Sequence, residues 1–145
     1  MSAAKKKQTG SHPRTRSDHA TELAEDYVEA IAETIEARGV CRVVDLASQF
    51  EVSHVTVNRT VGRLVRDGYA KTEPYSPITL TAKGKKLARI AAERHAIVLE
   101  FLKAIGVSEA AAIVDSEGIE HHVSKETLDA MKAFVAGRRP EIRAE

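Results

Sequence analysis

The stretch SHVTVNRTVGRLVRDGY, residues 53–69, constrains the fold more than any other part of the chain. Its apolar residues recur at helical spacing, Ser53 is a favourable N-cap, and Gly68 ends the pattern. A shorter helix is predicted just before it, at about 43–49. The inward-facing residues of that shorter helix are expected to be Val44, Leu46 and Ala47. Two short helices with a tight link between them predict a helix-turn-helix.

The segments on either side extend this pattern to a winged helix-turn-helix. Upstream, a helix is predicted from about 18 to 38, ending at Gly39. Its apolar positions are Leu23, Tyr27, Ala30, Ile31, Thr34 and Ile35. Downstream, residues 69–72 and 78–80 flank a proline-containing turn and predict a β-hairpin, the wing.

The rest of the chain predicts three further helices. Thr81 can cap a long one that ends at Gly106, and its apolar surface is too large for a single domain face. Ser108 and Ser124 can cap two more, ending at about 122 and 136. We expect the apolar side chains of the last two helices to form a homodimer interface: Ile113, Ile119, Leu128, Met131, Phe134 and Val135.

Composition excludes some classes of protein. Lys and Arg number 22 against 21 Asp and Glu, so the net charge of +1 does not identify a partner. The single cysteine, Cys41, allows no internal disulfide and fits a reducing compartment. The chain lacks both the ~18 consecutive apolar residues of a membrane span and an apolar secretory segment. We therefore expect a cytoplasmic protein with no membrane partner.

The second helix of the predicted pair is the expected reader of double-stranded operator DNA. A recognition helix presents its N-terminal side chains to base edges, where Asn and Arg can each form two hydrogen bonds. The outward positions are His54, Val55, Thr56, Asn58, Arg59 and Arg63, with Lys71 and Tyr75 on the wing. The alternative is a helix-turn-helix used only for protein contacts.

The stretch EGIEHHVS, residues 117–124, contains a second group of candidate functional residues. On a helix Glu117, Glu120 and His121 face one way, and two carboxylates so close repel each other unless a cation lies between them. No Lys or Arg occurs between positions 108 and 122, so a divalent cation is the economical partner. Asp26, Glu29 and His95 are further candidate ligands. Taken singly, such an acid pair is more often a solvated helix face, and such a histidine is more often structural.

Several motifs occur together in order: EDYVE, the helix-turn-helix, LTAKGKKLA, ERH, FLKAIGV and EGIEHHVS. Over about residues 24–131 they resemble the diphtheria-toxin-repressor family of metal-dependent transcriptional repressors. The similarity is greater to its manganese-responsive branch, because the iron-responsive branch has methionine in place of Asp26 and cysteine in place of Glu117.

The resemblance implies a binuclear manganese site. One ion would be held by Asp26, Glu117, Glu120 and His121, and the other by Glu29, His95, Glu117 and Glu120, with the backbone carbonyl of Glu117 as an extra ligand. Oxygen and imidazole ligands suit Mn²⁺, with Fe²⁺, Zn²⁺ or Co²⁺ as possible substitutes.

The implied protein is mainly α-helical and homodimeric, a manganese-responsive repressor of metal-ion transport genes without a C-terminal SH3-like domain. We divide the chain into a disordered basic tail at 1–17, a winged helix-turn-helix DNA-binding domain at 18–81, a helical dimerisation and metal-binding domain at 82–137, and a frayed tail at 138–145.

Other functions stay open. The same repressor could respond to iron or zinc, or a winged-helix regulator could respond to a small ligand without metal. An enzyme with a di-metal carboxylate centre is disfavoured, because neither His95 nor His121 has a glutamate three residues before it and no nucleophile or oxyanion group is evident.

Overall fold

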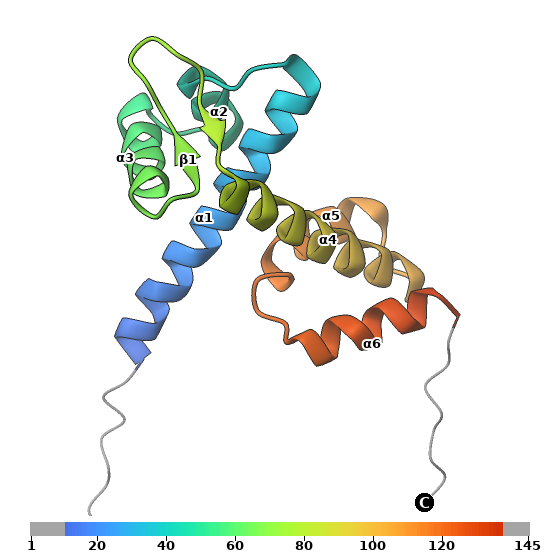
Figure 1. Ribbon diagram of the computed structural model, residues 1–145. Helices are drawn as coiled ribbons and strands as arrows, with labels where there is room; N and C mark the ends of the chain where they lie inside the picture. The colour runs from blue at the N-terminus through green and yellow to red at the C-terminus, as the bar shows by residue number, and fades with distance from the viewer. Residues whose placement is uncertain (1–10, 138–145) are drawn as a thin grey trace, which may run out of the picture.

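The computed structural model describes residues 11–137, and Figure 1 shows two helical groups joined by one long helix. In chain order the elements are α1 (Ser11–Arg38), α2 (Val43–Phe50), α3 (His54–Arg66), β1 (Ala70–Lys71), β2 (Thr79–Leu80), α4 (Ala82–Ala104), α5 (Glu109–Ile119) and α6 (Lys125–Val135). The predicted C-terminal tail and residues 1–10 of the predicted basic tail lie outside the described residues.

Helix α1 begins earlier than the sequence indicated. Residues 11–17 were predicted as part of a tail, and the helix was expected from about 18, yet α1 starts at Ser11. Pro13 is compatible with this start, because a first-turn backbone nitrogen needs no partner within the helix.

The first core lies between α1, α2, α3 and the wing. Its largest fully buried side chains include Tyr27, Ile31, Leu46, Val57 and Leu64. The ring of Tyr27 stacks on Phe50 at the end of α2, with centroids 4.4 Å apart and planes 3° from parallel. This core fixes the helix-turn-helix against α1.

Val44 does not face this core, contrary to prediction. Its side chain is 55% exposed, whereas Leu46 and Ala47 are buried as expected. The reason is geometric: two residues along an α-helix correspond to a rotation of about 200°. Burying Leu46 in an eight-residue helix therefore turns Val44 outward.

The wing is a short antiparallel pair. Ala70 pairs with Leu80 and Lys71 with Thr79, so the strands are shorter than predicted. A bridge from Cys41 to Ile78 ties the hairpin to the α1–α2 connection. Cys41 is fully buried, and burial raises the pKa of its thiol to about 11, which makes it a packing residue rather than a reactive thiolate.

Helix α4 begins against the wing. The Thr81 hydroxyl accepts a hydrogen bond from the Gly84 N–H at 3.1 Å and donates one to the Gly68 carbonyl at 2.6 Å. At Gly84 the helix passes so close to the wing that an added Cβ would lie 1.9 Å from the Tyr69 carbonyl oxygen. Glycine is therefore required at this position.

The far end of α4 forms the second core with α5 and α6, beyond its crossing with α1 (Figure 1). Val98, Leu102, Ala112 and Leu128 are its buried members. Leu128 is predicted at a dimer interface, but it is only 8% exposed because it belongs to this core within one protomer. Across residues 11–137, none of the helices is both long enough and apolar enough to span a membrane.

Candidate metal centre

The six predicted ligands come from four parts of the fold. Asp26 and Glu29 lie on α1, His95 on α4 and Glu117 on α5. Glu120 and His121 lie in the turn after α5, because this helix ends at Ile119 and not at about 122 as predicted. The chain must leave the helix here to give Ser124, the cap of α6, its extended backbone. Glu120 keeps helical dihedrals, so the expected convergence survives.

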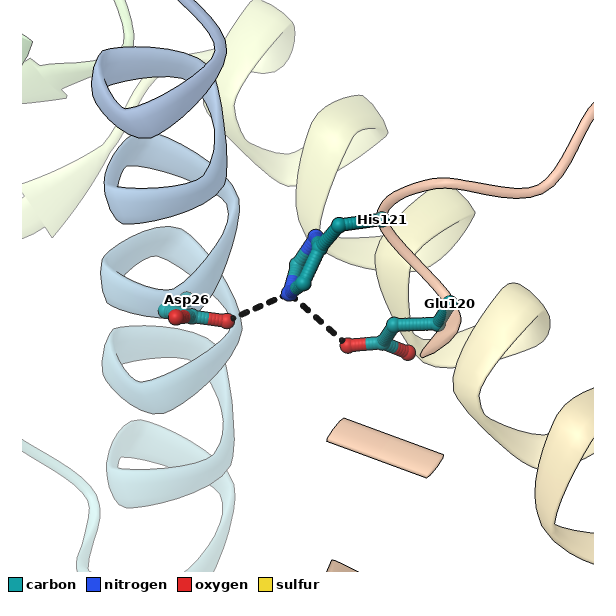
Figure 2. A group of neighbouring side chains, drawn as sticks. All are labelled: Asp26, Glu120 and His121. Atoms are coloured by element: carbon teal, nitrogen blue, oxygen red, sulfur yellow. Dashed lines mark hydrogen bonds and ion pairs between the residues drawn. The ribbon is translucent and has the colours of Figure 1, made fainter. Parts of the chain in front are cut away.

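Three of the six lie in direct contact (Figure 2). His121 Nε2 lies 3.0 Å from Asp26 Oδ1 and 3.3 Å from Glu120 Oε1. One ligating atom from each residue lies within 4.8 Å of the other two, which a single cation could bind. The contacts join α1 to the turn before α6.

The other three predicted ligands border the same space. A cavity of about 310 Å³ is lined by Asp26, Glu29, Ala30, Glu33, Gln49, Phe50, His95, Glu117 and Glu120. His95 Nδ1 lies 3.3 Å from Glu120 Oε2, so an imidazole stands at each oxygen of this carboxylate. Five of the predicted ligands thus line one cavity, and His121 contacts two of them.

Crowding of acids makes this cavity electrostatically costly without a cation. Burial raises the pKa of Glu120 to about 8, and this rise persists although the charge of His121 and, less, that of Arg94 act to lower it; Glu29 and Asp26 add to the rise. Burial, then Glu33 and Asp26, raise the pKa of Glu29 to about 7. Burial also raises the pKa of Asp26. A divalent cation would reverse these shifts because it stabilises the ionised carboxylates.

The pKa of His121 is raised, whereas burial alone would lower the pKa of a histidine. Burial acts to lower its pKa, but the hydrogen bond to Glu25 and the charges of Asp26 and Glu120 outweigh burial and raise it. A cation bound at Nε2 would have to displace any proton there, so metal and proton compete for this nitrogen.

Two residues around the site were not anticipated. Glu25 Oε2 lies 2.7 Å from His121 Nδ1, and Glu25 Oε1 lies 2.6 Å from an Arg94 guanidinium nitrogen. A positive charge close to the site therefore does exist, but Arg94 supplies it from α4 and not from residues 108–122. Both residues adjoin predicted ligands, in EDYVE and ERH, which is the signal that could have identified them. His122, by contrast, pairs with Glu22 and does not line the cavity.

The residues fit a divalent cation. Glu120 Oε2 is buried and makes no hydrogen bond within the described part of the chain, although His95 Nδ1 lies 3.3 Å away, and such an atom costs free energy unless a ligand compensates. The donor set consists of carboxylates and imidazoles without sulfur, which suits Mn²⁺ and similar ions.

The predicted DNA-contacting side chains are all solvent-exposed. On α3 these are His54, Val55, Thr56, Asn58, Arg59 and Arg63; on the wing they are Lys71 and Tyr75. Tyr75 stands fully exposed at the hairpin turn with φ 63°, and Val55 is 66% exposed although it is apolar. No nucleic acid is present, so their contacts with DNA stay a prediction.

Comparison with known proteins identifies both halves of the chain. Residues 19–78 match the family described as "Iron dependent repressor, N-terminal DNA binding domain", and residues 81–139 match "Iron dependent repressor, metal binding and dimerisation domain".

Curated relatives are similar over most of their length. The transcriptional regulator MntR of Escherichia coli O157:H7 is 46% identical over 121 residues, covering 83% of this chain and 78% of its own. The HTH-type transcriptional regulator MntR of Lysinibacillus sphaericus is 39% identical over 115 residues, covering 79% and 83%.

Solved structures share the fold. A manganese-dependent transcriptional repressor in complex with manganese superposes with a TM-score of 0.71 at 24% identity, and the manganese regulator SloR with 0.69 at 23%. Each match covers 80% of this chain, which spans about half the length of those proteins, 53% and 54%.

Proposed function

This chain belongs to the iron-dependent repressor family of transcriptional regulators, and we propose that it is a homodimeric repressor that binds operator DNA in response to manganese. Its targets would be genes of metal-ion transport. The names of the curated relatives support manganese, as does a donor set without sulfur. That the chain is not an enzyme stays a prediction.

The single observation that carries this proposal is the origin of the ligands. Asp26 and Glu29 lie within the region matched as DNA-binding, while His95, Glu117 and the Glu120–His121 pair lie within the region matched as metal-binding. A cation bound between them would tie the two regions together, because each contributes charged groups that repel one another without it.

Two ions would use the six residues as follows. One would be held by Asp26, Glu120 and His121, whose ligating atoms already lie together, with Glu117 completing the set. The other would be held by Glu29, His95 and the bridging carboxylates of Glu117 and Glu120, which border the cavity. The metals supply positive charge that makes the buried carboxylates favourable.

Homodimerisation would bring two copies of α3 to adjacent half-sites. Several apolar side chains of α5 and α6 are exposed in one protomer, and they are candidates for the interface: Ile113, Val114, Phe134 and Val135. DNA half-sites lie about one helical turn or a multiple apart. By fixing α1, metal would restrict the spacing of the two recognition helices and reduce the entropic cost of binding DNA. By linkage, DNA would raise metal affinity by the same factor.

The test is DNA binding by chelated full-length protein on its own upstream promoter at fixed salt. Mn²⁺, anaerobic Fe²⁺ or Zn²⁺ is added in parallel titrations, followed by EDTA. We expect strong retardation with Mn²⁺ that EDTA reverses. Stronger retardation with Fe²⁺ or Zn²⁺ at free concentrations matched to Mn²⁺ would favour the iron- or zinc-responsive alternative. Equal binding with and without every metal would contradict the proposal and favour a regulator that senses another ligand.

A further inference from the structure

Behind His121, on the side away from the other ligands, lies a chain of two charged groups. Arg94 Nη2 lies 2.6 Å from Glu25 Oε1, and Glu25 Oε2 lies 2.7 Å from His121 Nδ1. The side chains of His121 and Glu25 are only 4% and 9% exposed, and that of Arg94 is 23% exposed. These short contacts connect α4 to α1 and α1 to the turn after α5.

The arrangement gives the two ring nitrogens of His121 different partners. Nδ1 faces Glu25, while Nε2 faces Asp26 and Glu120. A carboxylate accepts hydrogen bonds and donates none, so Glu25 favours the form in which Nδ1 carries the proton. In the neutral ring, Nε2 then keeps its lone pair, which is the form that binds a metal ion.

Arg94 acts on Glu25 rather than on the histidine. Its contact with Oε1 orients the carboxylate, so that Oε2 points to Nδ1. Without this partner, Glu25 would be a nearly buried carboxylate beside Asp26, one helix residue away, and could turn toward a cation as a competing ligand.

We propose that Glu25 and Arg94 are positioning residues that orient His121 for manganese, holding the proton on Nδ1 and aiming Nε2 at the ion. This inference rests on the proposed function and deepens it by adding two residues from different helices to the six ligands. In other metal sites, substitution of a carboxylate in this position typically lowers metal affinity by about 10–100-fold.

The first test measures Mn²⁺ affinity by titration with detection of free Mn²⁺ in solution by electron paramagnetic resonance. Glu25→Gln removes the charge but keeps the size of the side chain, and we expect affinity about 10–100-fold below that of the wild type. The matched control is Glu36→Gln, an exposed glutamate further along α1 that does not line the cavity. The control is expected to bind like the wild type, and thermal unfolding checks that both variants fold.

The second test reads the histidine itself. In ¹⁵N-histidine-labelled protein loaded with diamagnetic Cd²⁺, the wild type is expected to show His121 with a strongly hydrogen-bonded Nδ1 proton that exchanges slowly with water. In Glu25→Gln this proton signal is expected to move upfield and exchange faster. A merely structural ion pair between Glu25 and Arg94 would leave it unchanged.

The third test asks whether Arg94 acts through Glu25. Arg94→Lys retains the positive charge near the site but loses the planar guanidinium, so we expect a smaller fall in Mn²⁺ affinity than in Glu25→Gln. The double variant is expected to bind no more weakly than Glu25→Gln alone, because the second change removes a contact already lost. Additive losses would overturn the role assigned to Arg94.

These outcomes separate the two proposals. If the wild-type protein neither binds Mn²⁺ nor changes its DNA affinity with it, the proposed function fails. If the wild type binds Mn²⁺ and Glu25→Gln binds it equally well with an unchanged His121 Nδ1 signal, the function stands and the positioning role is wrong.

Discussion

Asp26 on α1 and His121 in the turn after α5 are 95 positions apart in the sequence, yet Asp26 Oδ1 lies 3.0 Å from His121 Nε2. This contact joins a region matched as DNA-binding to a region matched as metal-binding and dimerising. A metal ion bound beside this contact would hold the two regions together. It would thereby restrict the spacing of the two recognition helices in the proposed dimer.

Replacing Glu117 with alanine is expected to abolish the manganese response and leave the fold intact. Glu117 is exposed at the edge of the cavity, so its removal creates no void, but it is a proposed bridge between both ions. The control is Asp115→Ala, two residues earlier on α5 and lining a different surface hollow. DNA retardation with Mn²⁺ and thermal unfolding are the measurements. Manganese-dependent binding by Glu117→Ala would mean that the bridging assignment is wrong.

The metal-free protein is expected to lose stability as pH rises from about 5 to about 8. The folded pKa values of Glu29 and Glu120, about 7 and about 8, lie above the ordinary value of 4.5. The native state therefore binds more protons than the unfolded state in this window, and the free energy of unfolding falls with pH. The raised pKa of His121 acts in the same direction.

Urea unfolding of chelated protein across this pH range measures the effect. Saturating Mn²⁺ is expected to flatten or reverse the slope, because a cation holds the carboxylates ionised and binds more tightly as protons leave. Stability of the metal-free protein that rises between pH 5 and 8 would contradict the electrostatic account of the cavity.

Substitution of Arg59 with alanine is expected to weaken operator binding by about 1–3 kcal/mol, the range for a lost bidentate base contact. Arg59 is exposed in the N-terminal half of α3. Arg89→Ala is the control, because Arg89 is exposed on α4 and outside the recognition helix. Titrations at fixed salt and saturating Mn²⁺ measure both. If only Arg89→Ala weakened binding, α3 would not be the DNA-reading element.

Gly84→Ala is expected to destabilise the protein by about 1–3 kcal/mol, the usual cost of overpacking. The new Cβ would lie 1.9 Å from the Tyr69 carbonyl oxygen, so α4 would have to move away from the wing. In Gly62→Ala the Cβ meets nothing within 4 Å, and this helical control is expected to gain about 0.5–1 kcal/mol. Thermal unfolding distinguishes the two. Equal effects would mean that the close approach at Gly84 does not exist in solution.

Much of the fold could be predicted because local signals coincide with element ends. The sequence predicts Ser53, Thr81, Ser108 and Ser124 as caps, and each accepts a hydrogen bond from a backbone N–H of the helix that follows it. Burial was harder to predict, because it depends on which face another element covers. Val44 and Leu128 are both apolar, and only the tertiary packing turns one outward and the other inward.

The candidate site was predictable where ligands cluster in the sequence, and not where their partners come from elsewhere. Glu117, Glu120 and His121 stand out because of their spacing. Arg94 is adjacent to the predicted ligand His95, but this position alone does not indicate that its guanidinium contacts Glu25 on α1. The same limit explains the misplaced end of α5, since the cap of α6 competes with one more turn of helix.

Phe50 belongs both to the first hydrophobic core and to the lining of the acidic cavity. It stacks on Tyr27 inside the helix-turn-helix core, and it lines the acidic cavity together with Gln49. The helix-turn-helix thus provides part of the lining of the cavity that would hold the metal. Metal binding in this cavity would act on the helix-turn-helix directly through the ring of Phe50. No longer series of contacting residues would be needed to couple the two. The proposed metal site and the helix-turn-helix are therefore adjacent in this protein, with Phe50 in contact with both.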